Sequence, residues 1–273
     1  MTELLDHPAI QGGVAPLVVA LIVAFALART RFAWLAIGAG YATMVALSTG
    51  FSFSPLTVAR KTVLIGLLVP FVGIAADFVP RRSREIAFAL AIVSGALAVW
   101  VFLTILQQRE GIRAFAVGGG IALFVAVLVA ATLRLREDGP RIGAAGLGLG
   151  LATGIAGVLS ASIGYLVAGV SIAAAAGALL LVQVVLSRVI ASGMTGALPV
   201  GLLAALFASG ALLIAELPWY ALPLLLLIPA AVTLPLPERA PIIVRAAIAA
   251  GYALIAAAIP IFAAWYAAHG SSS

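Results

Sequence analysis

Long apolar runs separated by short polar segments are the dominant pattern along this chain. A helix needs about 20 apolar residues to cross the roughly 30 Å hydrocarbon core of a bilayer, and runs of that kind recur throughout the sequence. The pattern predicts an all-α polytopic integral membrane protein with about ten transmembrane helices. The predicted spans are residues 13–28, 32–48, 62–79, 86–106, 114–133, 142–164, 166–187, 194–215, 219–236 and 241–266.

The division between the sixth and seventh spans rests on length. Residues 142–187 form a run of 46 residues without a charge. At about 1.5 Å per residue a single helix of this length would measure about 69 Å, which is too long for one crossing. We therefore expect a turn around Gly164, Tyr165 and Gly169.

The basic residues between the spans indicate the orientation, because cytoplasmic loops carry the excess of Lys and Arg. With ten spans and an external N-terminus, one set of loops holds most of these residues, so both termini are predicted to be external. Removing or adding one span would move the later clusters to the wrong side. The predicted cytoplasmic set is Arg29, Arg31, Arg81, Arg82, Arg84, Arg134, Arg136, Arg141, Arg188, Arg239 and Arg245, and the predicted external set is Arg60, Lys61, Arg109 and Arg113.

Composition supports a lipid environment. Hydrophobic residues make up 64% of the 273 residues and charged residues only 9%, whereas a soluble domain carries about 25% charged residues. The net charge of +6 does not indicate nucleic-acid binding, because that requires basic residues gathered on one solvated face. Membrane lipids are therefore the expected surroundings.

No linker or soluble segment interrupts the pattern, so residues 1–273 are predicted to form a single transmembrane domain. The spans divide into possible halves of five helices each, residues 1–133 and 142–266. An odd number of helices per half would turn the second half upside down relative to the first, as in the inverted repeats of many transporters.

Cysteine is absent, which excludes disulfides and thiol chemistry. The N-terminus lacks the basic segment of a cleaved signal peptide, so we expect the first apolar run to be a retained helix. The preference for Arg over Lys, together with the abundance of Ala and Gly, suits a GC-rich bacterial genome. These features predict a multi-pass protein of the bacterial inner membrane.

Three polar side chains inside predicted spans are candidates for substrate binding or ion coupling. Asp77 could bind a proton or a cationic substrate, since an intramembrane carboxylate is costly, or it could pair with Arg81 one turn later. Arg245 could hold a carboxylate or phosphate or extend to the headgroups. Gln183 could contact a substrate or form a hydrogen bond between helices.

Glycines in the sixth span favour close helix packing. Gly146, Gly150 and Gly154 recur every four residues and share one helix face, which lets a neighbouring helix approach the backbone. A nucleotide-binding interpretation does not fit, because no strand precedes the segment and no acidic partner follows it.

Prolines interrupt the last three spans. Each removes a backbone donor and frees a carbonyl, which kinks the helix. Broken helices often line the substrate cavity of a transporter, although proline kinks are also common in membrane helices that line nothing. The candidate cavity-lining kinks are Pro199, Pro223, Pro229 and Pro260.

The chain carries no catalytic signature. His-Glu-x-x-His, Gly-x-Ser-x-Gly and Walker motifs are absent. His7 and His269 lie at opposite ends of the chain, and no two carboxylates fall at one depth within the spans. We therefore predict no enzymatic activity, no metal and no cofactor.

Two functions fit these observations. The first is a small-molecule carrier or permease for a weakly polar or amphipathic solute, with a cavity bounded by the third, eighth, ninth and tenth spans. The alternative is a non-catalytic structural or assembly subunit of a larger membrane complex, which small-residue helix faces and short loops also fit. Partners would then be a second copy of the chain or the other chains of a heteromeric complex.

Overall fold

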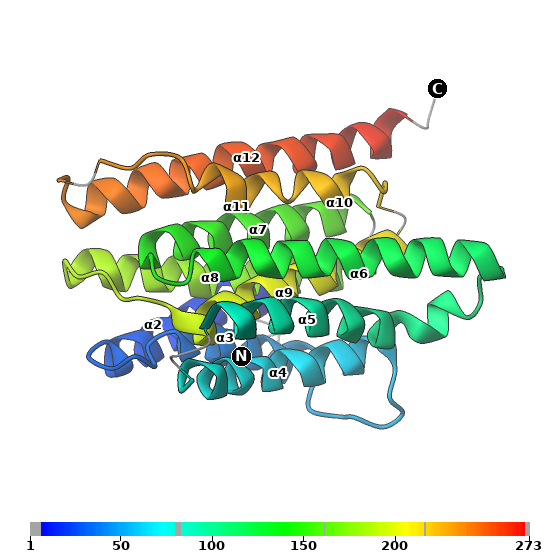
Figure 1. Ribbon diagram of the computed structural model, residues 1–273, viewed down its shortest axis with the longest axis horizontal. Coiled ribbons are helices and arrows are strands. Elements are labelled where there is room, and N and C mark those ends of the chain that lie inside the picture. The colour runs from blue at the N-terminus through cyan, green and yellow to red at the C-terminus, as the bar shows by residue number, and fades with distance from the viewer. Residues whose placement is uncertain (1–6, 80–82, 161, 216, 238, 271–273) are drawn as a thin grey trace.

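The computed structural model describes residues 7–79, 83–160, 162–215, 217–237 and 239–270, and within these ranges all regular structure is helical. The helices lie along one common axis and pack into a single bundle (Figure 1). Eight helical segments in the described ranges are long and apolar enough to cross a membrane. They are η1 with α2 (Ile10–Val14 and Ala15–Leu27), α4 (Val58–Asp77), α5 (Ser83–Leu106), α6 (Gly111–Arg134), α7 (Gly139–Leu159), α8 (Ile163–Val185), α9 (Gly193–Ile214) and α12 (Ile242–Gly270).

Two further apolar segments are helical but short. Helix α3 (Leu35–Ser48) has 14 residues, about 21 Å at ~1.5 Å per residue. The segment predicted as the ninth span contains α10 (Ala221–Leu224) and α11 (Leu227–Ala231). Pro223 lies within α10 and Pro229 within α11, and proline removes backbone donors, which explains the interruption. Helices thus occur in all ten predicted segments, and eight of them meet the length of a full span.

The turn within residues 142–187 falls slightly earlier than expected. Helix α7 ends at Leu159 and α8 begins at Ile163. Gly164 and Tyr165 therefore belong to the first turn of α8, and Gly169 lies within that helix. A uniformly apolar run fixes the number of helices by its length but leaves the position of the turn open by several residues.

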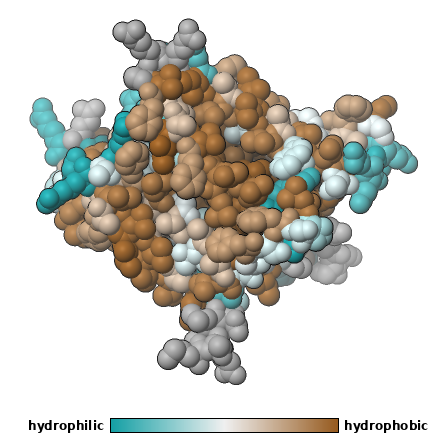
Figure 2. Space-filling view, turned by 90° about the horizontal axis from the view of Figure 1, so that it is seen from below, coloured by the Kyte–Doolittle hydropathy of each residue, from teal (hydrophilic) through white to brown (hydrophobic). Residues whose placement is uncertain are grey.

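Helix α9 lies at the centre of the bundle. Every residue from Met194 to Ala211 is buried, as expected of a helix that is hydrophobic on all sides. The outer helices instead expose large apolar side chains, including Ile22 on α2 and Phe88 on α5. Figure 2 shows apolar side chains across the middle of one face, with hydrophilic side chains gathered toward its two ends.

Polar contacts bring the loops rich in arginine to one end of the bundle. The Trp34 indole donates to the Ile190 carbonyl at 3.0 Å, and Ser192 donates to the Arg136 carbonyl at 2.9 Å. We call the end of the bundle where these contacts lie the arginine-rich end. The described arginines in these loops and helix ends are Arg29, Arg31, Arg84, Arg134, Arg136, Arg141, Arg188, Arg239 and Arg245. Gln11, which donates to the Leu47 carbonyl at 3.1 Å, belongs to the opposite end.

Candidate functional site

A cavity of about 480 Å³ lies in the half of the bundle away from the arginine-rich end. It is bounded mainly by α3, α4, α8 and α9, with contributions from η1 and α5. The side chains around it are aromatic, aliphatic or uncharged polar groups. The main lining residues are Gln11, Tyr41, Met44, Ser48, Thr49, Thr62, Phe102, Ser162, Tyr165, Val167, Leu206 and Phe207.

Three aromatic rings from three helices form one wall of this cavity. The ring of Phe207 on α9 lies 6.1 Å from that of Tyr41 and 6.5 Å from that of Tyr165, measured between centroids. These separations are typical of attractive aromatic pairs. Two glycines make the space: a Cβ at Gly66 would lie 2.7 Å from Tyr41 Cζ, and one at Gly210 would lie 2.9 Å from Tyr165 Cζ. We call Tyr41, Tyr165 and Phe207 the aromatic wall.

Hydroxyl groups give the cavity its polar character. Within the described chain no hydrogen bond joins the hydroxyl of Tyr41 or Tyr165 to another residue. Ser48 and Thr62 donate to carbonyls of their own helices at 2.7 and 3.0 Å, so their oxygens can still accept. The lining can therefore offer a solute both donors and acceptors without a charge.

The nearest buried charge is directed away from the cavity. Lys61 is 8% exposed, and its ammonium donates to the Trp100 carbonyl at 3.2 Å. The same nitrogen lies 4.8 Å from the centroid of the Trp100 ring, which adds a cation–π contact. The charge of Lys61 is thus held by α5.

Asp77 lies at the arginine-rich end, where it caps α9. Its carboxylate accepts from the backbone N–H of Met194 at 2.7 Å and from that of Thr195 at 3.0 Å, and from the Thr195 hydroxyl at 2.7 Å. These N–H groups belong to the first turn of α9, where a helix has no internal acceptors and where its dipole favours a negative charge. The alternative partner, Arg81, lies outside the described residues.

Gln183 completes a buried polar arrangement beside this cap. Its amide donates to the Leu179 carbonyl at 3.2 Å and its oxygen accepts from the Ile190 N–H at 3.1 Å. Its side chain therefore binds the segment between α8 and α9, and it does not line the cavity. We call the side chains of Asp77, Trp34, Gln183 and Ser192, with their backbone partners, the polar cap.

Arg245 pairs with the carboxylate that caps α7. Its guanidinium lies 3.6 Å from Asp138 Oδ2, and that of Arg141 lies 3.1 Å from the same oxygen. Asp138 also accepts from the Arg141 backbone N–H at 3.3 Å. The structure thus places Arg245 against α7, near the surface and far from the aromatic wall.

The three glycines of α7 face α8. A Cβ at Gly150 would lie 2.5 Å from the Ala173 nitrogen, and one at Gly146 would lie 2.8 Å from the Ala176 Cβ. Gly154 meets Gly169, where an added Cβ would lie 2.5 Å from the Gly154 nitrogen. The two backbones approach too closely for larger side chains, in the manner of small-residue helix pairs in membranes.

The four prolines occupy different environments. Pro199 and Pro229 are buried in α9 and α11, and Pro260 is buried within α12. Pro223 lines a separate hollow of about 540 Å³ on the outside of α6 and α10, beside Trp219. The cavity with the aromatic wall is instead formed by helices of the first and second halves of the chain, without α10, α11 or α12.

Sequence reasoning missed the aromatic wall. Tyr41 and Phe207 lie inside long apolar runs, where an aromatic residue is common and does not indicate a binding site. The isolated glycines Gly66 and Gly210 were a signal, since a single glycine in a helix often accommodates a large neighbour. Within the described part of the chain no group of three or more His, Cys, Asp or Glu residues could hold a metal ion.

Comparison of the chain with family models, with curated proteins and with solved structures finds no match.

Proposed function

We propose that this protein is a membrane carrier for an uncharged, weakly polar or amphipathic solute, which binds in the cavity beside the aromatic wall. The observation that carries the proposal is an interior cavity that combines three aromatic rings with the hydroxyls of Tyr41 and Tyr165, which form no hydrogen bond with another described residue. Its volume of about 480 Å³ is within the usual range for small-molecule sites.

The lining favours this class of solute over ions. Phe102, Met44 and the aromatic wall offer apolar surface, while the hydroxyls supply hydrogen bonds in both directions. No charged side chain lines the cavity among the described residues, so a charged solute would enter without a counter-charge, which is costly. Solutes with an apolar body and one or two hydroxyl, carbonyl or amide groups match best.

The ends of the bundle differ in a way that suits alternating access. In the ten-span topology that we propose, with both termini external, the cavity lies toward the external side of a bacterial inner membrane. The polar cap then closes the cytoplasmic side. Tyr41 comes from the first five helices and Tyr165 and Phe207 from the last five, so rocking of one half against the other would open the site to either side in turn.

One observation favours the alternative function, a subunit of a larger complex. An added Cβ at Gly119 or Gly120 on α6 would meet no heavy atom within 4 Å. These glycines leave open backbone on an outer helix, and such faces often pack against another membrane helix. That arrangement would need no binding cavity.

Single cysteines distinguish the two functions, because the native chain has none. Thr62→Cys places a thiol in the cavity, and Met194→Cys places one beneath the polar cap, where Met194 is 2% exposed. Ser94→Cys, at a buried position on α5 outside the cavity, is the control. Each variant is reconstituted in oriented vesicles and treated with a membrane-impermeant maleimide from one side or the other.

If the protein is a carrier, the maleimide should label Thr62→Cys from the external side. It should label Met194→Cys from the cytoplasmic side, and more slowly. In a double variant that carries both Thr62→Cys and Met194→Cys, a bulky adduct on the cavity cysteine should hold the site open to the external side. Labelling of the Met194→Cys thiol should then slow by about tenfold, since the outward-open conformation excludes the inward-open one. Ser94→Cys should stay unlabelled. Labelling of Met194→Cys that is absent, or independent of the cavity adduct, would overturn the carrier function.

A further inference from the structure

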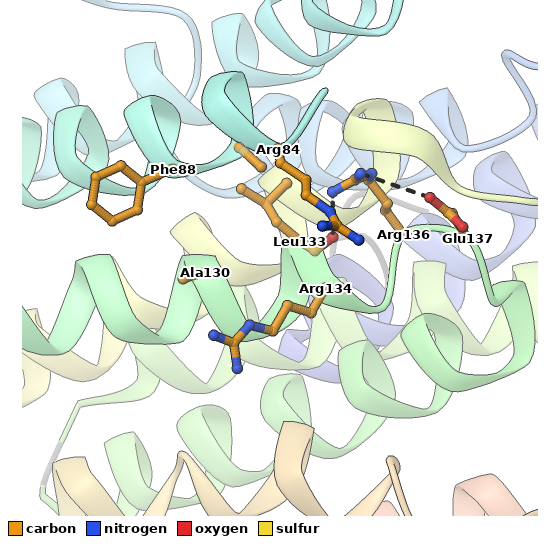
Figure 3. Close-up of a pocket in the computed structure, with 8 residues that line it drawn as sticks. Arg84, Phe88, Ala130, Leu133, Arg134, Arg136 and Glu137 are labelled. Atoms are coloured by element: carbon orange, nitrogen blue, oxygen red, sulfur yellow. Dashed lines mark hydrogen bonds and ion pairs between the residues drawn. The ribbon is translucent and has the colours of Figure 1, made fainter. Parts of the chain in front are cut away.

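A second hollow, of about 450 Å³, lies at the arginine-rich end between the start of α5 and the end of α6. Arginines and apolar side chains share its lining. Figure 3 shows Arg84, Arg134 and Arg136 around the C-terminal end of α6, with Phe88 and Ala130 further along the two helices. The hollow is separate from the cavity beside the aromatic wall.

Two of these arginines have no partner in the described part of the chain. Neither Arg84 nor Arg134 forms a hydrogen bond or an ion pair with another described residue. Arg136 donates to the Leu133 carbonyl at 3.3 Å and lies 3.7 Å from Glu137, whose side chain is 87% exposed. Among the described residues that line the hollow, three are arginines and one, Glu137, is acidic.

Three other arginines at this end have partners among the described residues. The guanidinium of Arg31 lies 4.1 Å from the centroid of the Phe78 ring, and those of Arg141 and Arg245 lie against Asp138. The hollow between α5 and α6 brings two arginines without a partner among the described residues, Arg84 and Arg134, to one space. Guanidinium groups bind phosphate oxygens through paired N–H donors, so a phosphate is the complementary ligand.

The apolar part of the hollow selects among phosphates. Phe88 is 68% exposed and Ile92, one turn further along α5, is 54% exposed. Both lie on the outer surface of the bundle, where acyl chains would cover them. A ligand that joins an anionic headgroup to hydrocarbon chains matches this surface better than a free anion does, and basic pockets between helices at the cytoplasmic side commonly hold such lipids.

We propose that this hollow binds the headgroup phosphate of an anionic phospholipid, with Arg84 and Arg134 on the phosphate and the acyl chains along Phe88. The site is independent of solute carriage and would serve a carrier or a complex subunit equally. A bound lipid would also join α5 to α6 at the end where each helix begins or ends.

Native mass spectrometry of the delipidated full-length chain in detergent tests this site. The protein is titrated with phosphatidylglycerol, with phosphatidylcholine of the same acyl chains, and with phosphatidylglycerol in the presence of inorganic phosphate. The site variant is Arg84→Gln with Arg134→Gln. The matched control, Arg109→Gln with Arg113→Gln, removes the same charge from the opposite end.

Phosphatidylglycerol should bind the native chain more tightly than phosphatidylcholine, and the site variant should lose about tenfold or more of that affinity. The control variant should keep it, and inorganic phosphate should not displace the lipid. The exposed Arg134→Gln alone should give a smaller loss in the same direction, so the result does not depend on the folding of the double variant. Equal binding of both lipids, equal losses in both double variants, or full displacement by phosphate would overturn the proposal.

Discussion

Replacing Asp77 by alanine removes the acceptor for three donors at the start of α9. The donors are the N–H groups of Met194 and Thr195 and the Thr195 hydroxyl, at 2.7 to 3.0 Å from the carboxylate. Both residues are nearly fully buried, at 2% and 1% exposed, so water cannot readily replace the lost acceptor. The first turn of α9 should therefore separate more easily from α4.

The size of the effect follows from these three bonds. Hydrogen bonds to a charged group contribute about 1.5–3 kcal/mol each when buried, and removal of a helix cap costs about 0.5–2 kcal/mol. Because Asp77 itself is partly exposed, about 1 kcal/mol per bond is the appropriate figure, or about 3 kcal/mol in total. At about 1.4 kcal/mol per factor of ten, the opened state should become about a hundredfold more populated.

The assay is the rate at which a maleimide labels Met194→Cys in detergent, compared with and without Asp77→Ala. When opening and closing are faster than labelling, this rate follows the population of the opened state. Asp77→Asn keeps one acceptor oxygen and should raise the rate by about tenfold. Glu137→Ala removes a carboxylate from the same end that is 87% exposed, and it should leave the rate unchanged.

A Thr62→Cys variant that also carries Asp77→Ala controls for general unfolding. The rate at which its cysteine is labelled should equal that of Thr62→Cys alone. Rates for Met194→Cys within threefold of each other, with and without Asp77→Ala, would refute the capping role of Asp77.

Two further predictions concern helix packing and ion pairing. Gly150→Leu should abolish recovery of monodisperse protein in size-exclusion chromatography, because even a Cβ at this position would lie 2.5 Å from the Ala173 nitrogen. Gly120→Leu is the control and should purify as the native chain does, because a Cβ there would meet no heavy atom within 4 Å. Equal recovery of the two variants would contradict the α7–α8 contact. A double-mutant cycle of Arg245→Leu and Asp138→Ala, read from thermal denaturation in detergent, should give a coupling of about 1 kcal/mol or less, because the pair is 3.6 Å apart and about a quarter exposed. A coupling several times larger would show that the pair is far better shielded from solvent than its exposure indicates.

The helices and their approximate limits follow from the sequence alone. A backbone in lipid must satisfy its own hydrogen bonds, so a long apolar run can only be a helix, and its length reports whether it can span. Eight of the predicted spans are confirmed as helices of sufficient length, while the count of ten and the external termini stay predictions. The four-residue spacing of Gly146, Gly150 and Gly154 likewise indicated a packing face, because that spacing depends only on the period of the helix.

The partners of the functional side chains were decided by the tertiary structure. Asp77 binds groups 117 and 118 residues away, and sequence spacing could offer only a local partner such as Arg81. The aromatic wall depends on how α3, α8 and α9 are rotated about their axes, and apolar runs with little amphipathic pattern do not encode that rotation. Packing against Gly66 and Gly210 turns Tyr41 and Tyr165 toward Phe207, so the cavity exists only once the helices have assembled.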